Sequence, residues 1–157
     1  LPMDKKKDIY ITQEEFERTY LGETVFEYSG RLNADFTDAI MGGVDLQGLD
    51  LSNSVLQRAD LSRANLAHTS LNGANLERAH LEGVDLSNAD LSGANLRGIN
   101  LSGANLSGAD LTGASLFQAD LTDADLTGAD LTRAYINGAI LCNTIMPEGS
   151  VIYSGCK

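Results

Sequence analysis

Large apolar residues recur at every fifth position along most of the chain. The series runs from Phe36 through Met41 to Met146, and a small residue, most often Ala, stands two positions before each member. Five residues on an α-helix turn through about 500°, so successive leucines would spread around the cylinder instead of forming a stripe. On a continuous strand, an odd period would send successive leucines to opposite faces. The pattern therefore excludes a single helix and a single strand.

A backbone that turns a corner once every five residues, always in the same sense, keeps all the large side chains inside. In each short extended piece the small and the large residue point inward, and the polar residue between them points outward. The next two residues form the corner, and the second is often Gly, as at Gly73, which suits the positive φ of a type II turn. Where that position holds a larger side chain we expect type I corners, namely at Arg58, Arg63, Arg78, Gln118, Asp123 and Arg133.

The A(D/N)LXX units resemble the pentapeptide repeat family, in one register from Ala34 to about Met146. A tandem array of this length is a specific signature. The resemblance implies an all-β fold, a right-handed quadrilateral parallel β-helix with about twenty residues per coil. Stacked coils would lie about 4.8 Å apart. One column of inward residues, the core ladder, is then expected at Phe36, Leu56, Leu76, Leu96, Leu116 and Ile136.

Both ends of such a stack need a cap, because they expose apolar side chains and unpaired backbone. We expect three segments. Residues 1–33 would form an N-terminal tail, a short capping α-helix and an irregular first coil. Residues 34–146 would form the β-helix, and residues 147–157 a capping tail.

The N-terminal cap is predicted from local signals. Thr12 and Glu15 have the spacing of a capping box, which predicts a helix from Gln13 to about Leu21 that Gly22 ends. Its apolar side chains would lie on the first coil, namely Phe16, Tyr20 and Leu21.

Composition narrows the classes of function. The chain has 157 residues, which suits one domain, and a net charge of -11. This charge argues against direct binding to nucleic acid or to anionic membranes. No apolar run approaches the roughly 20 residues of a membrane span, so we expect no membrane insertion. The first residues lack the apolar stretch of a signal peptide, and a start at Leu1 leaves open that a targeting segment has been removed.

The outward positions predict an acidic column along one wall, formed by Asp50, Ser70, Asp90, Asp110 and Asp130. The simpler interpretation is a solvated wall that the repeat imposes. The functional interpretation is charge mimicry, because some members of the family resemble duplex DNA in shape and charge and act on DNA gyrase.

Two aromatic residues break the pattern on one predicted wall. Phe117 occupies an outward corner position, and Tyr135 occupies an outward mid-strand position one coil further along. Exposed aromatic side chains on a polar wall can anchor a partner. The alternative is that the C-terminal tail folds back over them. Arg97 is expected to stack between Glu77 and Phe117.

Catalytic chemistry finds little support. His68 and His80 fall in different columns, and metal ligands must converge at about 2.0 to 2.2 Å, whereas coil spacing holds neighbours about 4.8 Å apart. Ser and Thr are plentiful, but no His and acid are placed to activate them. We therefore expect no catalytic, metal or cofactor site, and we predict that the protein is not an enzyme.

The two cysteines of the chain lie near its C-terminus. Cys142 takes an outward corner position and Cys156 lies in the tail. The ending LCNTIMPEGSVIYSGC is similar to that of many cyanobacterial pentapeptide repeat proteins, which favours a disulfide between them. Two free thiols are the alternative. A disulfide would imply the periplasm or the thylakoid lumen, because reducing cytosol disfavours such bonds.

The sequence thus predicts a non-enzymatic rigid rod that serves as a binding surface or scaffold in the periplasm or thylakoid lumen. Its protein partner is unidentified, and the rod is expected to be a monomer or to associate weakly end to end. The alternative is a cytoplasmic regulator that imitates DNA and occupies the basic groove of an enzyme such as DNA gyrase.

Overall fold

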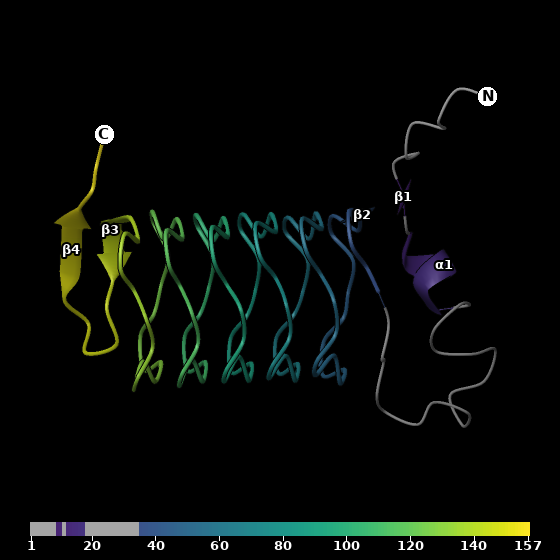
Figure 1. Cartoon of the computed structure of the whole chain (residues 1–157), viewed down its shortest axis with the longest axis horizontal. Coiled ribbons are helices and arrows are strands. Elements are labelled where there is room, and N and C mark those ends of the chain that lie inside the picture. Colours follow the sequence, from purple (N-terminus) through teal and green to yellow (C-terminus); the bar gives the residue numbers. More distant parts are fainter. Residues whose placement is uncertain (1–8, 11, 18–34) are drawn as a thin grey trace.

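The computed structural model describes residues 9–10, 12–17 and 35–157. The repeat region forms an elongated rod, with short N-terminal elements at one end and a C-terminal hairpin at the other (Figure 1). The named elements are β1 (Ile9–Tyr10), α1 (Gln13–Phe16), β2 (Ala39–Ile40), β3 (Leu141–Ile145) and β4 (Val151–Ser154).

Stacked coils make up the rod. Parallel bridges join residues twenty positions apart, from the pair Asp35 and Val55 to the pair Asp125 and Ile145. Each coil bonds to the next through its backbone, so that the Leu91 amide donates to the carbonyl of Asp110, at 2.7 Å. The parallel β-helix that the period of five predicts is therefore present.

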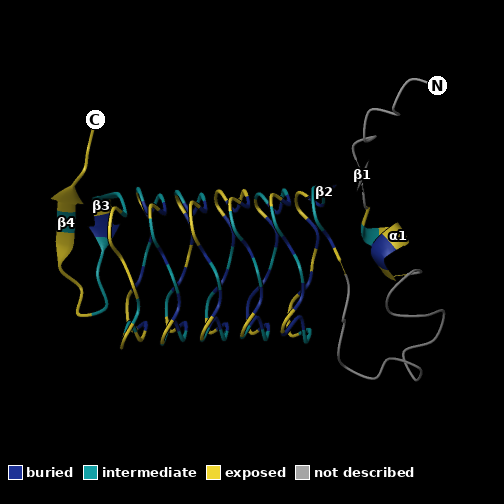
Figure 2. Cartoon of the chain, viewed as in Figure 1, coloured by how far each residue is buried: buried dark blue, intermediate teal, exposed yellow. Residues whose placement is uncertain are grey.

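The inward side chains form a continuous core. Along the predicted core ladder, the first five members are at most 2% exposed, from Phe36 to Leu116. The prediction is wrong for the sixth member, because Ile136 is 38% exposed. Among the described residues no further coil lies on the coil that contains it. In Figure 2 blue, buried stretches recur in every coil in the middle of the rod, whereas the C-terminal end is mostly yellow and teal.

The second corner residue of every pentapeptide from Asp38 to Asn143 adopts the left-handed conformation, including those that are not glycine. The φ angle is 55° at Arg58, 56° at Arg63 and 58° at Gln118. The prediction of type I corners at Arg58, Arg63, Arg78, Gln118, Asp123 and Arg133 is therefore wrong, since φ is positive at all six. The reason lies in the stack: the Arg63 amide donates to the carbonyl of Glu82 at 2.8 Å, and this bond requires the same corner in each coil.

The N-terminal elements close the first coil. The hydroxyl of Thr12 accepts a hydrogen bond from the Glu15 amide at 3.1 Å, as the capping box predicts. The buried Phe16 ring lies 6.2 Å from that of Phe36. The side chain of Gln13 pairs with the backbone of Asp45, as acceptor at 2.7 Å and as donor at 3.3 Å.

β1 completes this cap by pairing in parallel with β2. The predicted continuation of the helix to Leu21, its stop at Gly22 and the contact of Tyr20 lie outside the described residues. The Phe16 ring of α1 thus supplies apolar contact, and the Gln13 side chain supplies a hydrogen-bond donor and acceptor. A preceding coil would otherwise provide both.

Candidate binding surfaces

The acidic column is explained first by local structure. Parallel bridges connect its members, as between Asp90 and Asp110. One carboxylate oxygen of Asp90 accepts from both the amide and the hydroxyl of Ser92, at 2.9 and 2.6 Å. Asp110 makes the same pair of bonds to Thr112, at 2.9 and 2.7 Å. Each carboxylate therefore braces its own corner and leaves its second oxygen for other contacts.

Bonds of the same kind favour the ionised form of the carboxylate at three other aspartates. The Ser62 hydroxyl lowers the pKa of Asp60, and the Thr127 hydroxyl lowers that of Asp125. The Thr132 hydroxyl does the same for the pKa of Asp130. These three aspartates thus keep their negative charge at neutral pH.

Basic side chains are unevenly distributed over the rod. The acidic walls are the two adjacent walls whose outward mid-strand columns run from Asp45 to Asp125 and from Asp50 to Asp130. Of the described arginines, Arg133 and Arg63 lie at corners that border these walls, and Arg58, Arg78 and Arg97 lie at corners away from them. The acidic walls therefore carry most of the uncompensated negative charge of the described rod.

One ion pair lies outside the acidic walls. The guanidinium of Arg58 makes two bonds to Asp38 across one coil, at 2.7 and 3.2 Å. Both side chains are substantially exposed, so water and salt screen the pair and it adds little to the stability of the fold.

The aromatic stack comprises Arg97, Phe117 and Tyr135. The ring centroids of Phe117 and Tyr135 are 6.1 Å apart and 28° from parallel. The Arg97 guanidinium carbon lies 5.1 Å from the Phe117 centroid, as predicted, whereas a contact of Arg97 with Glu77 stays a prediction. The Tyr135 hydroxyl accepts a bond from Asn137 at 2.9 Å.

The tail does not cover the aromatic stack. Tyr135 remains 50% exposed, because the tail turns at the last coil and β4 pairs antiparallel with β3. The alternative in which the tail folds back over both aromatic residues is therefore wrong. What remains is a partly exposed aromatic and cationic stack on a polar wall.

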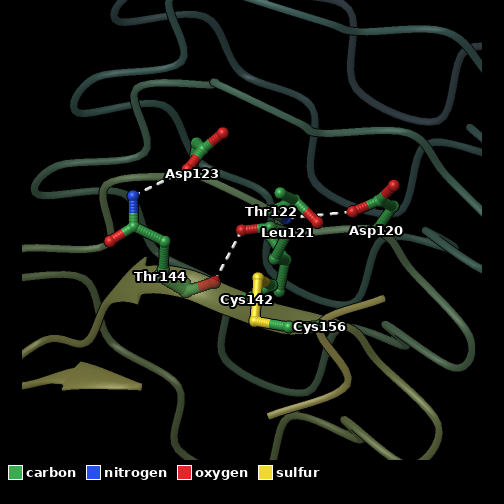
Figure 3. The surroundings of a disulfide bond; sticks show 8 residues. Asp120, Leu121, Thr122, Asp123, Cys142, Thr144 and Cys156 are labelled. Carbon is green, nitrogen blue, oxygen red and sulfur yellow. Dashed lines mark hydrogen bonds between the residues drawn. A yellow bond between two sulfur atoms is a disulfide. The ribbon is translucent and has the colours of Figure 1, made fainter. Parts of the chain in front are cut away.

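Cys142 and Cys156 form a disulfide, with their Cα atoms 4.8 Å apart (Figure 3). The bond joins a corner of the last coil to the residue that follows β4 and Gly155. Beside it, the buried Thr144 hydroxyl donates to the Leu121 carbonyl at 2.7 Å. The disulfide and the hairpin together fasten the tail to one side of the end of the rod.

No converging reactive cluster is found within the described ranges. His80 bridges to Asp60 and Asn100 along its column, while His68 lies at a corner with a φ of 59°. Among the described residues, no three His, Cys, Asp or Glu side chains are grouped to hold a metal ion. The described part of the chain also has no helix with the length and apolar character of a membrane span.

The family model for pentapeptide repeats matches residues 32–66, 59–98 and 109–146, with 8 copies of the repeat. The chain belongs to the pentapeptide repeat family. Proteins of this family are generally repeat scaffolds that form a right-handed β-helix. No curated protein sequence matches the chain.

Two solved structures of the family resemble this one. Rfr23 from the cyanobacterium Cyanothece 51142 is 44% identical, with a TM-score of 0.52, over 58% of each chain. A pentapeptide repeat protein from the thylakoid lumen of Arabidopsis thaliana is 34% identical, with a TM-score of 0.51, over 62% of this chain and 64% of that one. This chain thus matches less than two thirds of the length of either relative.

A third structure is more distant. Full-length QnrB1, a plasmid-mediated fluoroquinolone resistance protein, is 18% identical, with a TM-score of 0.25, over 96% of this chain and 89% of its own. At this level of similarity it supports no inference about function.

Proposed function

We propose that this pentapeptide repeat protein is a non-enzymatic binding surface or scaffold that acts in the periplasm or the thylakoid lumen. The observation that carries the proposal is the aromatic stack, in which Tyr135 is 50% exposed on a polar wall. We infer a four-sided rod over residues 34–146, flanked by the N-terminal segment 1–33 with its capping helix and by the tail 147–157. Such a rod would present the stack at a fixed position to a protein partner.

The disulfide supports the compartment. A bond between Cys142 and Cys156 fits an oxidising environment, since cytosolic thiols are normally kept reduced. The relative from Arabidopsis thaliana is a thylakoid lumen protein.

Binding is tested with a matched pair of variants. The chain Phe117→Ser/Tyr135→Ser loses the aromatic stack, and the chain Asp90→Asn/Asp110→Asn loses charge from the acidic column while keeping its acceptor oxygens. Both are immobilised beside the wild type, and captured proteins are quantified by mass spectrometry. A partner held by the wild type and the Asn variant, and lost by the Ser variant, supports the proposal. If the Ser variant still captures the partner, the aromatic stack is not the surface that binds it.

The compartment is tested by thiol trapping in freshly lysed native cells. An alkylating reagent is added at lysis, and mass spectrometry reads Cys142 and Cys156. A linked pair supports the exported scaffold. Two alkylated thiols place the protein in a reducing compartment and favour the second candidate.

The second candidate is a cytoplasmic DNA-mimicking regulator of an enzyme such as DNA gyrase. It is favoured by the acidic walls, whose carboxylates Asp125 and Asp130 have pKa values held below the usual range. The protein would then inhibit or protect gyrase in a supercoiling assay, with an effect that weakens as salt rises. The Asp90→Asn/Asp110→Asn chain would be weaker in the same assay. No change at a large excess of wild type would exclude this activity for the enzyme used.

A further inference from the structure

The dipeptide Asn-Gly occurs twice in the chain, within LNGA at residues 71–74 and within INGA at residues 136–139. Each forms the same corner, in which the amide of the fourth residue donates to the carbonyl of the first, at 3.0 and 3.1 Å. The φ angle is 66° at Gly73 and 72° at Gly138, as in a type II turn. Two chemically matched corners therefore lie at different places along the rod, one between coils and one in the last coil.

An Asn-Gly dipeptide contains a reactive pair of groups. The glycine nitrogen can attack the side-chain amide carbon of the asparagine, because glycine has no Cβ atom to obstruct the approach. The new C–N bond closes a cyclic imide, and ammonia leaves with the proton of the glycine N–H. Water then opens either carbonyl of the ring, which leaves aspartate or isoaspartate. The reaction thus consumes one water and needs no oxidant, reductant or second protein.

The stack restrains the first corner on both sides. The Gly73 amide donates to the Ser92 carbonyl at 3.0 Å, and the Asn72 carbonyl accepts from the Asn53 amide, also at 3.0 Å. Ring closure must rotate the peptide unit that joins Asn72 to Gly73, because the glycine nitrogen has to approach the asparagine side chain. This rotation breaks bonds to both neighbouring coils, so Asn72 can react only when the stack opens.

The second corner is restrained by the stack on one side. The Asn137 carbonyl accepts from the Gln118 amide at 3.0 Å, but the Gly138 amide has no backbone acceptor among the described residues. Asn137 and Gly138 are both exposed. The nitrogen that attacks is thus already free of the stack, and local opening of a single corner is enough for the reaction.

The side-chain amide of Asn137 is held by one surface contact. Its nitrogen donates to the Tyr135 hydroxyl at 2.9 Å, and Tyr135 is 50% exposed. Water readily replaces either partner of such a bond, so the side chain can turn toward the Gly138 nitrogen.

We propose that Asn137 is a site of spontaneous deamidation in the folded protein, and that the coils on both sides of Asn72 protect it from the same reaction. The product carries an added negative charge, and its isoaspartate form lengthens the main chain of the corner by a methylene group. The fold tolerates this change, since no coil among the described residues pairs with the outer side of the last corner.

Deamidation alters the aromatic stack of Arg97, Phe117 and Tyr135. The new carboxylate has no N–H group, so the present bond to the Tyr135 hydroxyl as acceptor is lost, and a negative charge is added near the ring. A partner that binds the stack would then meet a different surface on an aged chain. This consequence rests on the proposed function, whereas the reaction itself does not.

Peptide mapping of the purified full chain tests the proposal. The folded chain is incubated for several weeks in a mildly alkaline buffer, and mass spectrometry follows the conversion of amide to acid at Asn137 and at Asn72. Chromatography separates the isoaspartate peptide from the aspartate peptide. A parallel sample in concentrated urea gives the rates in the unfolded chain. Asn137→Gln is the control for assignment, because its longer side chain closes a ring far more slowly.

In the folded chain we expect Asn137 to convert at least about tenfold faster than Asn72, with isoaspartate among its products. In urea the two sites should convert at similar rates, because their neighbours are nearly the same. The signal from the last corner should disappear in Asn137→Gln.

Similar rates for Asn137 and Asn72 in the folded chain would overturn the proposal, and so would an Asn137 that stays intact there. Conversion of Asn137 to aspartate alone would also overturn it, because a cyclic imide yields both products. The assay contains no binding partner, so these failures are distinguishable from failure of the proposed function.

Discussion

Leu116 and Ile136 occupy the same column of the rod, one coil apart, yet Leu116 is fully buried and Ile136 is 38% exposed. Their own pentapeptides have the same pattern. The difference arises because Leu116 has a coil on each side and Ile136 has a coil on one side. In a solenoid, a repeat residue is buried by neighbours twenty positions away, so a nearly uniform repeat produces a rod with a stable middle and a less stable end.

The largest effect is expected from a charge placed in the middle of the rod. Leu96→Asp buries a carboxylate among apolar neighbours and should destabilise the fold by about 4 kcal/mol or more, enough to unfold it. Ile136→Asp keeps its carboxylate near water and should destabilise it by about 1 kcal/mol. Urea unfolding followed by circular dichroism measures both. Equal losses of unfolding free energy would mean either that Leu96 is not buried within the stack or that Ile136 does not lie at an open end.

The second effect concerns the disulfide. Replacing Cys142 and Cys156 by Ser removes the closure of a loop that spans 14 positions, worth at most about 3 kcal/mol. Because most of β4 is exposed, the loss should appear as local opening of the hairpin and not as unfolding of the rod. Limited proteolysis should cut the variant faster near β4, while the main urea midpoint changes little. A large shift in that midpoint would mean that the hairpin and the rod unfold together.

Two glycines give a smaller and cleaner comparison. Gly113 lies in the middle of the rod with a φ of 66°, and Gly149 lies in the turn before β4 with a φ of 90°. Each has room for a Cβ atom, so substitution by Ala adds backbone strain of about 1 kcal/mol without a clash. Gly113→Ala should lower the global stability by that amount, and Gly149→Ala should leave it nearly unchanged. The same urea titrations measure both variants. Equal shifts of the urea midpoint would contradict the difference in stability between the middle of the rod and its C-terminal end.

The smallest effect is expected from acid. The pKa of Asp60 is lowered in the folded state, first by the Ser62 hydroxyl, so its contribution to stability is complete above the usual aspartate pKa of about 3.9. It is lost as the pH falls through the lowered folded pKa. Ser62→Ala should weaken this contribution, and Thr132→Ala, beside the fully exposed Asp130, should do so less. Thermal unfolding between about pH 6 and pH 2 checks the order. An unchanged acid profile for Ser62→Ala would show that the hydroxyl bond does not stabilise the fold.

The period of five and the family resemblance together predict the architecture and most of the core. A period of five excludes helix and strand, and the resemblance supplied the spacing of twenty that places Leu96 over Leu76. The corners could not be predicted one residue at a time. Arg63 alone favours a type I turn, but its amide bonds to the next coil, and this bond imposes a positive φ.

The candidate surfaces were predicted only in part. The spacing places Phe117 and Tyr135 on one wall. The path of the C-terminal tail, however, depends on the turn after Met146, which the repeat does not determine. The bonds from Ser and Thr hydroxyls to the preceding aspartates had a sequence signal, the recurring order DLS or DLT. The pairing of Gln13 with Asp45 has no such signal, because the two residues lie far apart in sequence.

Residue-resolved hydrogen exchange tests the central claim, that stacking on both sides makes the middle of the rod more stable than its C-terminal end. At low protein concentration, the amides of Leu76, Leu96 and Leu116 should exchange only with global unfolding. Those of Leu131 and Ile136, which have no backbone acceptor in the described part of the chain, should exchange orders of magnitude faster. Equal protection of Leu116 and Ile136 would contradict the account, because it would show that the last coil is covered as fully as the coils within the rod.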